Sequence, residues 1–270
     1  VQGELTGLAG GATPQAGELA LSMEKLTGID SLDPPSSTLT VRAGTTLQAI
    51  QKAAEDAGLL FPLDLGARGS CQIGGLIATN AGGNQVLRFG MARNLVLGLE
   101  VVLPDGTVVS SMNRMLKNNA GYDLKQLFIG TEGTLGVVTR AVLRLYPRMP
   151  STCTALCALR SFPDIISLLR QTQTEVGSSL SAYEVMWASY FDYVTDHVEK
   201  LQSPFAQSYP LYALIETEGT DASTDMDRFE RALGAALESG VIEDAAVAKS
   251  EKEAQTFWSI RDGIAEITTA

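Results

Sequence analysis

Between residues 36 and 58, hydrophobic and polar positions first alternate with a period of two, and hydrophobic positions then recur with the period of a helix. The segment "SSTLTVRAG" predicts a strand, and "TTLQAIQKAAEDAG" predicts a helix that is capped by Thr45 or Thr46 and ends at Gly58. Further along, "LGLEVVLPDGTVVSS" predicts two strands joined by the turn "PDG", because these turn residues suit a hairpin.

A further alternating segment, "VVTRAVLRLYP", closes the first half of the chain. Ala141, Leu143 and Leu145 share one face of it, and Arg140 and Arg144 lie on the other, as in a half-buried strand. Together with the hairpin and the helix, this segment predicts a mixed α+β unit.

The second half of the chain has longer helical patterns. "TALCALRSF" and "YPLYALIETEG" predict strands, "PDIISLLRQTQTEVG" predicts a helix, and a later helix has Met226, Phe229, Leu233 and Leu237 near one face. This alternation predicts a small sheet with helices packed on one side.

A change of composition near "LYPRMPS" marks a domain boundary. Most of the 26 glycines lie between Gly3 and Gly136, and Pro147 and Pro150 flank the change. We therefore expect an α+β chain of two domains, 1–148 and 149–270.

The charge of the chain argues against nucleic acid as a partner. The 20 Lys and Arg residues face 31 Asp and Glu residues, which gives a net charge of −11 without a clustered basic stripe. The sequence contains no run of the roughly 20 apolar residues that a membrane span needs. We expect a soluble protein of the cytoplasm, with the mitochondrial matrix as the alternative.

The cysteines and the single histidine offer little catalytic chemistry. Cys71, Cys153 and Cys157 have no metal-knuckle spacing, which predicts free thiols in a reducing compartment. His197 follows "YFDYVTD" on a predicted surface helix, where a lone imidazole forms neither a catalytic triad nor a zinc site.

Three glycine-rich segments in the first half carry the strongest functional signal: "VQGELTGLAGGATP", "DLGARGSCQIGGLIATNAGG" and "IGTEGTLGVVT". Glycine in this density indicates tight turns or a ligand that approaches the backbone closely. A nucleotide phosphate is the candidate ligand, since loops with free N–H groups bind anions. Neither the Rossmann G-x-G-x-x-G pattern nor a P-loop Gly-Lys pair occurs.

The three segments, in this order, resemble the FAD-binding type of the vanillyl-alcohol oxidase and p-cresol methylhydroxylase family. With "RFGMARNLVLGLEVVLPDGTV" and "KNNAGYDLKQLFIGTEGTLGVVT", the likeness is in particular to the FAD-linked D-2-hydroxy-acid dehydrogenases that act on D-2-hydroxyglutarate, and it runs over nearly the whole chain. The resemblance implies a two-part FAD-binding domain whose N-terminal portion is missing here, followed by a C-terminally incomplete α+β substrate (cap) domain. It also implies oxidation of D-2-hydroxyglutarate to 2-oxoglutarate by hydride transfer to FAD. The electrons then pass to an acceptor that the sequence does not identify, and the sequence leaves open whether the protein is a homodimer.

Cofactor residues are carried over from the resemblance position by position. They are Gly3, Thr6, Gly7, Gly69, Ser70, Cys71, Ile73, Gly74, Gly75, Ala78, Thr79, Asn80, Gly82, Gly83, Glu132, Gly133, Gly136, Val137 and Val138. Because the glycine-rich half contains no histidine, we expect the FAD to be bound noncovalently.

The chain departs from the family pattern at two places. Glu4 and Leu5 stand where Gly-Asn is common, and a carboxylate there disfavours a pyrophosphate unless it turns outward. The family's catalytic residues, and the ligands of a divalent metal such as zinc, lie beyond the position of Ala270. The alternatives to a D-2-hydroxyglutarate dehydrogenase are therefore a D-lactate or glycolate dehydrogenase and a catalytically silent FAD-binding fragment.

Arg261 is the one candidate substrate residue. In the helix "EAQTFWSIRDGIAEI" its side chain lies in the apolar arc of Ala254, Phe257, Trp258, Ile264 and Ala265. A buried guanidinium needs an internal carboxylate or an anionic ligand. The resemblance favours a substrate carboxylate, although Ala265 stands where the family often has a hydroxyl residue.

Overall fold

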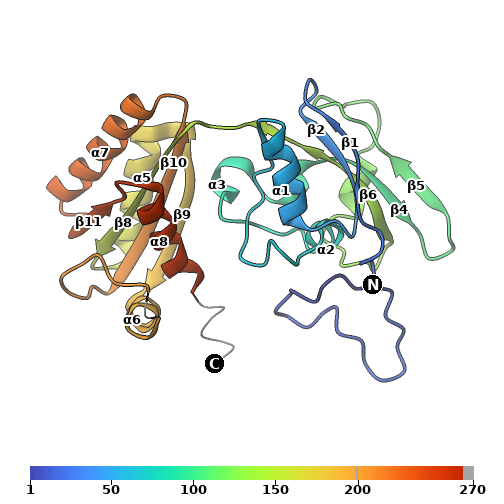
Figure 1. Cartoon of the computed structure of the whole chain (residues 1–270), viewed down its shortest axis with the longest axis horizontal. Coiled ribbons are helices and arrows are strands. Elements are labelled where there is room, and N and C mark those ends of the chain that lie inside the picture. Colours follow the sequence, from blue (N-terminus) through green and yellow to red (C-terminus); the bar gives the residue numbers. More distant parts are fainter. Residues whose placement is uncertain (199, 264–270) are drawn as a thin grey trace. The chain divides into compact units, whose positions relative to one another are not determined.

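The chain divides into two units, Val1–Arg148 and Met149–Ala270, in a computed structural model that describes residues 1–198 and 200–263 (Figure 1). Each unit has its own antiparallel sheet, and separate groups of buried side chains pack on each sheet. Helices and sheets are mixed in both units, as the α+β prediction requires.

The sheet of the first unit has the strand order β1-β2-β6-β4-β5. Its strands are β1 (Ile29–Asp33), β2 (Thr38–Arg42), β4 (Val96–Val102), β5 (Val108–Ser111) and β6 (Val137–Arg144). Strands β4 and β5 form the predicted hairpin, with Val102 opposite Val108. A small second sheet pairs β3 (Leu59–Leu60) with β7 (Tyr146–Pro147).

Short helices fill the connections of this unit. They are α1 (Leu47–Asp56), α2 (Ile73–Ala78), α3 (Val86–Phe89), α4 (Ala92–Leu95) and the 3-10 turn η1 (Leu124–Leu127). Helix α1 begins as predicted, since the Thr46 hydroxyl accepts a hydrogen bond from the N–H of Ala49. Gly58 follows its end at a φ of +71°, a left-handed conformation that glycine adopts at little cost.

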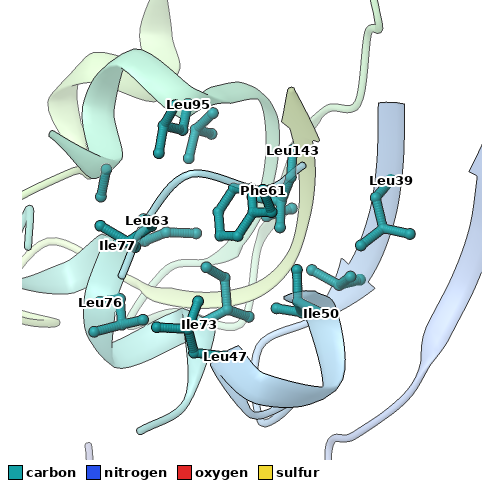
Figure 2. Packing of buried hydrophobic residues seen from close by; sticks show 14 of the residues in the cluster. Leu39, Leu47, Ile50, Phe61, Leu63, Ile73, Leu76, Ile77, Leu95 and Leu143 are labelled. Atoms are coloured by element: carbon teal, nitrogen blue, oxygen red, sulfur yellow. The ribbon is translucent and has the colours of Figure 1, made fainter. Parts of the chain in front are cut away.

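The core of the first unit lies between the sheet and helices α1 and α2. Leu39 of β2, Leu143 of β6, Ile50 of α1 and Ile77 of α2 belong to one cluster of buried side chains, and all four are fully buried (Figure 2). Because α2 belongs to the second glycine-rich segment, this packing holds that segment against the core.

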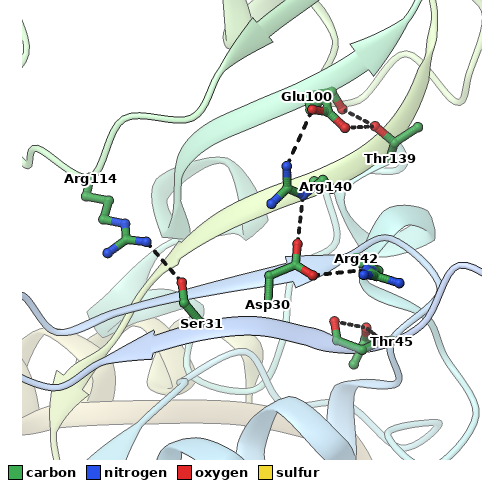
Figure 3. Close-up of polar contacts among 9 residues, drawn as sticks. Asp30, Ser31, Arg42, Thr45, Glu100, Arg114, Thr139 and Arg140 are labelled. Carbon is green, nitrogen blue, oxygen red and sulfur yellow. Dashed lines mark hydrogen bonds and ion pairs between the residues drawn. The ribbon is translucent and has the colours of Figure 1, made fainter.

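The opposite face of the sheet carries a network of charges (Figure 3). The Asp30 carboxylate contacts Arg42 at 3.0 Å and Arg140 at 2.7 Å, and Arg140 lies 3.6 Å from Glu100. Burial acts to raise the pKa of Asp30, but the hydrogen bonds from Arg140 and Arg42 outweigh it and lower the pKa. These cross-strand pairs stabilise the alignment of β2, β6 and β4.

The sheet of the second unit has the order β11-β8-β10-β9. Its strands are β8 (Ser151–Leu159), β9 (Leu180–Trp187), β10 (Leu211–Gly219) and β11 (Asp244–Val247). The helices are α5 (Phe162–Val176), α6 (Ala188–His197), α7 (Ala222–Glu238) and α8 (Glu251–Asp262), with a 3-10 turn η2 (Gly177–Ser179).

Helices cover both faces of this sheet, so the prediction of helices on one side is wrong. Leu168 of α5 and Phe229 of α7 pack on one face, whereas Phe191 of α6 and Ile260 of α8 pack on the other. The physical reason lies in β8, where nearly every side chain is buried. A strand with two apolar faces needs cover on both.

Helix α7 shows a second departure from the expected pattern. Phe229 and Leu233 are buried as predicted, and Met226 packs against them. Leu237, however, is 44% exposed, and Ala236 is the buried residue of the last turn. The apolar stripe therefore turns toward Ala236 at the end of the helix.

Candidate cofactor and substrate sites

One cavity of about 490 Å³ lies in the first unit, among the three glycine-rich segments. Its wall is formed by residues 1–13, by α2 with the residues before it, and by the segment that leads into β6. This volume falls in the range of small-molecule and cofactor sites.

Most of the predicted cofactor residues lie on this wall. Those that do are Gly3, Thr6, Gly7, Cys71, Gly74, Gly75, Ala78, Thr79, Glu132, Gly133, Gly136, Val137 and Val138. Segments more than 50 residues apart in sequence thus meet at one cavity. The fold therefore brings most of the cofactor residues implied by the resemblance to the same cavity.

The other predicted residues, Gly69, Ser70, Ile73, Asn80, Gly82 and Gly83, are not on the wall. Ile73 is 1% exposed in the core, and the Asn80 side-chain oxygen accepts a hydrogen bond from the N–H of Arg93 at 3.0 Å. A Cβ on Gly83 would lie 2.4 Å from the carbonyl oxygen of Asp64. Ile73, Asn80 and Gly83 thus contact other parts of the same chain. A cofactor role for all six residues stays a prediction.

Two adjacent glycines of α2 serve different purposes. A Cβ on Gly74 would lie 2.8 Å from the Cβ of Ala43, so glycine there permits a close approach of two chain segments. A Cβ on Gly75 would meet nothing within 4 Å, and Gly75 lines the cavity. The open backbone at Gly75 suits a ligand lying against α2.

Gln72 is a cavity residue that the sequence pattern did not single out. Gln72 is 5% exposed, and its Nε2 donates a hydrogen bond to Glu4 Oε1 at 3.2 Å. Its Oε1 has no hydrogen-bond partner within the described part of the chain. The signal available in the sequence was a polar residue directly before the apolar start of α2. Glu4 has not turned away from the cavity, since it lies on the wall beside Gln72.

The three cysteines are free, as predicted, and all three are buried. Cys71 lies on the cavity wall with 2% exposure, and burial raises the pKa of its thiol. Burial also raises the pKa of Cys157 to about 12. None of these thiols is an activated nucleophile at neutral pH.

In the second unit, the guanidinium of Arg261 pairs with two carboxylates. Its Nε and Nη2 donate to Glu184 Oε2 at 2.9 and 2.7 Å, and its Nη1 donates to Asp262 Oδ1 at 3.0 Å. Burial acts to lower the pKa of Arg261, but both carboxylates raise it above its ordinary value. The internal pairing weighed in the sequence analysis is therefore present.

The surroundings of Arg261 match the predicted apolar arc in part. Phe257 is 7% exposed, and the indole N–H of Trp258 donates to Glu216 Oε2 at 2.7 Å. The hydroxyl of Tyr190 donates to the Arg261 carbonyl at 2.6 Å, which holds the end of α8. Ile264 and Ala265, also expected in the arc, lie outside the described residues.

The remaining candidate chemistry is limited. His197 is exposed at the end of α6, where its ring stacks on Tyr193 and its Nδ1 lies 2.9 Å from the Tyr193 carbonyl. Within residues 1–198 and 200–263, no group of three or more His, Cys, Asp and Glu side chains is placed to hold a metal ion. Over the same residues, every helix is too short or too polar to cross a bilayer.

Two family models match the chain along these units. Residues 1–111 match the FAD binding domain, and residues 148–270 match the C-terminal domain of FAD linked oxidases. The chain therefore contains regions that match both domains of FAD-linked enzymes, as the resemblance in the sequence predicted.

The chain is also similar in sequence to curated proteins with named activities. The chain is 43% identical over 266 residues to a mitochondrial D-2-hydroxyglutarate dehydrogenase of Bos taurus, with 98% of this chain and 48% of the relative covered. It is 39% identical over 267 residues to a D-2-hydroxyglutarate dehydrogenase of Xanthomonas citri pv. viticola, with 98% and 55% covered. A putative mitochondrial D-lactate dehydrogenase of Schizosaccharomyces pombe is 36% identical, with 98% and 50% covered. The chain thus spans about half the length of the curated relatives it matches.

A solved structure supports the fold. Alkyldihydroxyacetonephosphate synthase matches 96% of this chain and 49% of its own with a TM-score of 0.73, at 19% sequence identity. The expected fold class, an FAD-binding domain followed by an α+β domain, is confirmed by this likeness and by the two family models.

Proposed function

We propose that the chain is the FAD-binding and partial substrate-binding portion of a flavin-dependent D-2-hydroxy-acid dehydrogenase. The observation that carries this proposal is the convergence of three glycine-rich segments on one cavity, within the unit that contains the FAD binding domain match. The relatives named D-2-hydroxyglutarate dehydrogenase favour oxidation of D-2-hydroxyglutarate to 2-oxoglutarate.

The cavity residues fit the chemical demands of FAD. The wall is largely apolar or bare backbone, with Gly75 open to the cavity and Val137 and Val138 also on the wall, which suits a flat ring and a nucleotide. When bound, FAD supplies the acceptor for the hydride that leaves the substrate carbon. The chain's own residues would hold the cofactor and exclude water, and the proton of the substrate hydroxyl needs a base that we place beyond Ala270.

A thermal-shift comparison of FAD and NAD tests the cofactor assignment. A ligand that binds the folded state raises the melting temperature, so FAD should stabilise the chain and NAD should not. Stabilisation by NAD alone, at matched concentrations, would contradict the flavin proposal.

We further propose that the FAD is held noncovalently. The only thiol on the wall is Cys71, whose pKa is raised by burial, and the only histidine of the chain is in the second unit. Acid precipitation of protein reconstituted with FAD should release yellow flavin into the supernatant. Flavin retained in the pellet would instead point to a bond at Cys71.

For the substrate, we propose that Arg261 binds a carboxylate while Glu184 orients its guanidinium. A guanidinium has five N–H donors, and the contacts with Glu184 and Asp262 use three of them. The side chain is 32% exposed, so the terminal nitrogens can donate to a further anion. In the full-length protein, Arg261→Met should lower kcat/KM by a factor that corresponds to roughly 1.5–3 kcal/mol.

The second candidate activity is a D-lactate or glycolate dehydrogenase, which the relative named putative D-lactate dehydrogenase favours. These substrates have one carboxylate, whereas D-2-hydroxyglutarate has two. A panel of monocarboxylate and dicarboxylate hydroxy acids, assayed on the full-length protein with an artificial electron acceptor, separates the two. Binding of FAD without turnover of any hydroxy acid would instead favour a silent FAD-binding protein.

The compartment and the metal are also proposals. The mitochondrial names of the relatives from plants, animals and yeast support the mitochondrial matrix over the cytoplasm, and fractionation of source cells tests this. The divalent metal expected of full-length members finds no ligand cluster among the residues that the structure describes.

A further inference from the structure

The charged side chains on the wall of the cavity are all acidic. Among the described residues that line it, Glu4 and Glu132 are negatively charged and none is Lys or Arg. Pyrophosphate-containing cofactors carry negative charge, and basic side chains are a common means of binding phosphate. This cavity must bind an anion without that help.

The backbone of residues 3–12 offers the alternative means. All of these residues line the cavity, and their N–H groups donate to no acceptor in the described part of the chain. Consecutive free N–H groups in a loop form an anion-binding surface. These N–H groups are therefore available to an anionic group at the wall that also carries Glu4.

Glu4 is held at that wall by a neutral partner. Gln72 Nε2 donates to Glu4 Oε1 at 3.2 Å, and the amide cannot cancel the charge of the carboxylate. Gln72 is 5% exposed, and its Oε1 already lacks a partner among the described residues. Rotation of Glu4 into solvent would leave both ends of a buried amide unsatisfied, which is unfavourable.

We propose that the negative charge of Glu4 repels the pyrophosphate of FAD and so lowers the affinity of the chain for the cofactor. This inference rests on the proposed FAD cavity. The repulsion is electrostatic, so it weakens as salt shortens the Debye length. The FAD affinity of the wild-type chain should thus approach that of a chain without this charge as the ionic strength rises.

The test is the dissociation constant of FAD, measured by quenching of flavin fluorescence from low to high salt, for the wild-type chain and Glu4→Gln. Glutamine keeps the length of the side chain and the acceptor for Gln72 while it removes the charge. We expect about ten-fold tighter FAD binding at low salt, the effect of one unit charge near a phosphate, and a ratio that falls toward one at high salt. Neutral riboflavin should behave alike with both proteins.

A matched control is Glu238→Gln, which removes one exposed carboxylate from the end of α7 in the other unit. It should leave FAD binding unchanged, so a gain equal to that of Glu4→Gln would overturn the proposal as a net-charge effect. Equal FAD affinity of wild type and Glu4→Gln at all salt concentrations would overturn it while leaving the FAD site intact. FAD binding by neither protein would overturn both the FAD site and the role of Glu4.

Discussion

The ion pair between Arg261 and Glu184 joins α8 to β9 and should be the largest polar contribution to the stability of the second unit. Removing one partner of a fully buried pair costs about 3–5 kcal/mol, and removing one partner of an exposed pair costs about 0.2–1 kcal/mol. The two side chains are 32% and 24% exposed. We therefore expect Arg261→Met to lower the free energy of unfolding by about 1.5–3 kcal/mol.

A double-mutant cycle with Glu184→Gln isolates the pair. The glutamine oxygen can still accept from both guanidinium nitrogens, so Glu184→Gln alone should cost about 0.5–1.5 kcal/mol. The double variant should be more stable than the sum of the single losses predicts, by at least about 1 kcal/mol, because Glu184 is no longer left as an unpaired carboxylate.

The assay is urea unfolding followed by tryptophan fluorescence. The two tryptophans of the chain, Trp187 and Trp258, both belong to the second unit, so the signal reports on the unit that contains the pair. Trp258 lies one helical turn before Arg261. Losses that add within about 0.5 kcal/mol would refute the internal pairing, and an unchanged stability of Arg261→Met would leave substrate binding as the reason for the arginine.

Three further predictions follow from burial and charge. Leu233→Ala should cost about 2–4 kcal/mol of unfolding free energy, whereas Leu237→Ala should cost less than about 0.5 kcal/mol, because the first leucine is 3% exposed and the second 44%; equal urea midpoints would contradict the packing of α7. Asp30→Asn should cost up to about 1 kcal/mol at pH 7. Since the folded-state pKa of Asp30 lies below its ordinary value of 3.8, this stabilisation is present above that value and is lost as the pH falls through the folded-state pKa, so circular dichroism should show the variant and wild type converging below pH 3.8. Ellman's reagent at pH 8 should find no reactive thiol in the folded chain and all 3 after denaturation, because the cysteines are buried; rapid labelling of native protein would show an open cavity at Cys71.

Local signals in the sequence predicted local structure well. The Thr46 cap, Gly58 after α1 and the hairpin of β4 and β5 depend on neighbouring residues, and all are confirmed. Strand β9 and the short edge strand β11 were missed, because each is stabilised by pairing with β10 or β8 rather than by its own pattern.

The candidate sites were predictable to the extent that glycine marks them. The three glycine-rich segments do line one cavity, but the sequence could not distinguish a glycine open to the cavity from one that packs on chain, as Gly75 and Gly83 differ. The partners of Arg261 and Glu4 were also out of reach. Glu184 is 77 residues from Arg261, and Gln72 is 68 residues from Glu4, so only the fold brings them together.

The contrast between Gly74 and Gly75 has an evolutionary consequence. A side chain at position 74 collides with Ala43 and would be removed by selection for folding, whatever the protein binds. A Cβ at position 75 would meet no chain atom within 4 Å, so selection for packing leaves that position open and the proposed ligand is what would constrain it. On the proposed cofactor assignment, a descendant with leucine at position 75 would lose the room for FAD while its backbone at that position stayed unobstructed, so one codon would separate a flavoprotein from a folded, flavin-free cousin.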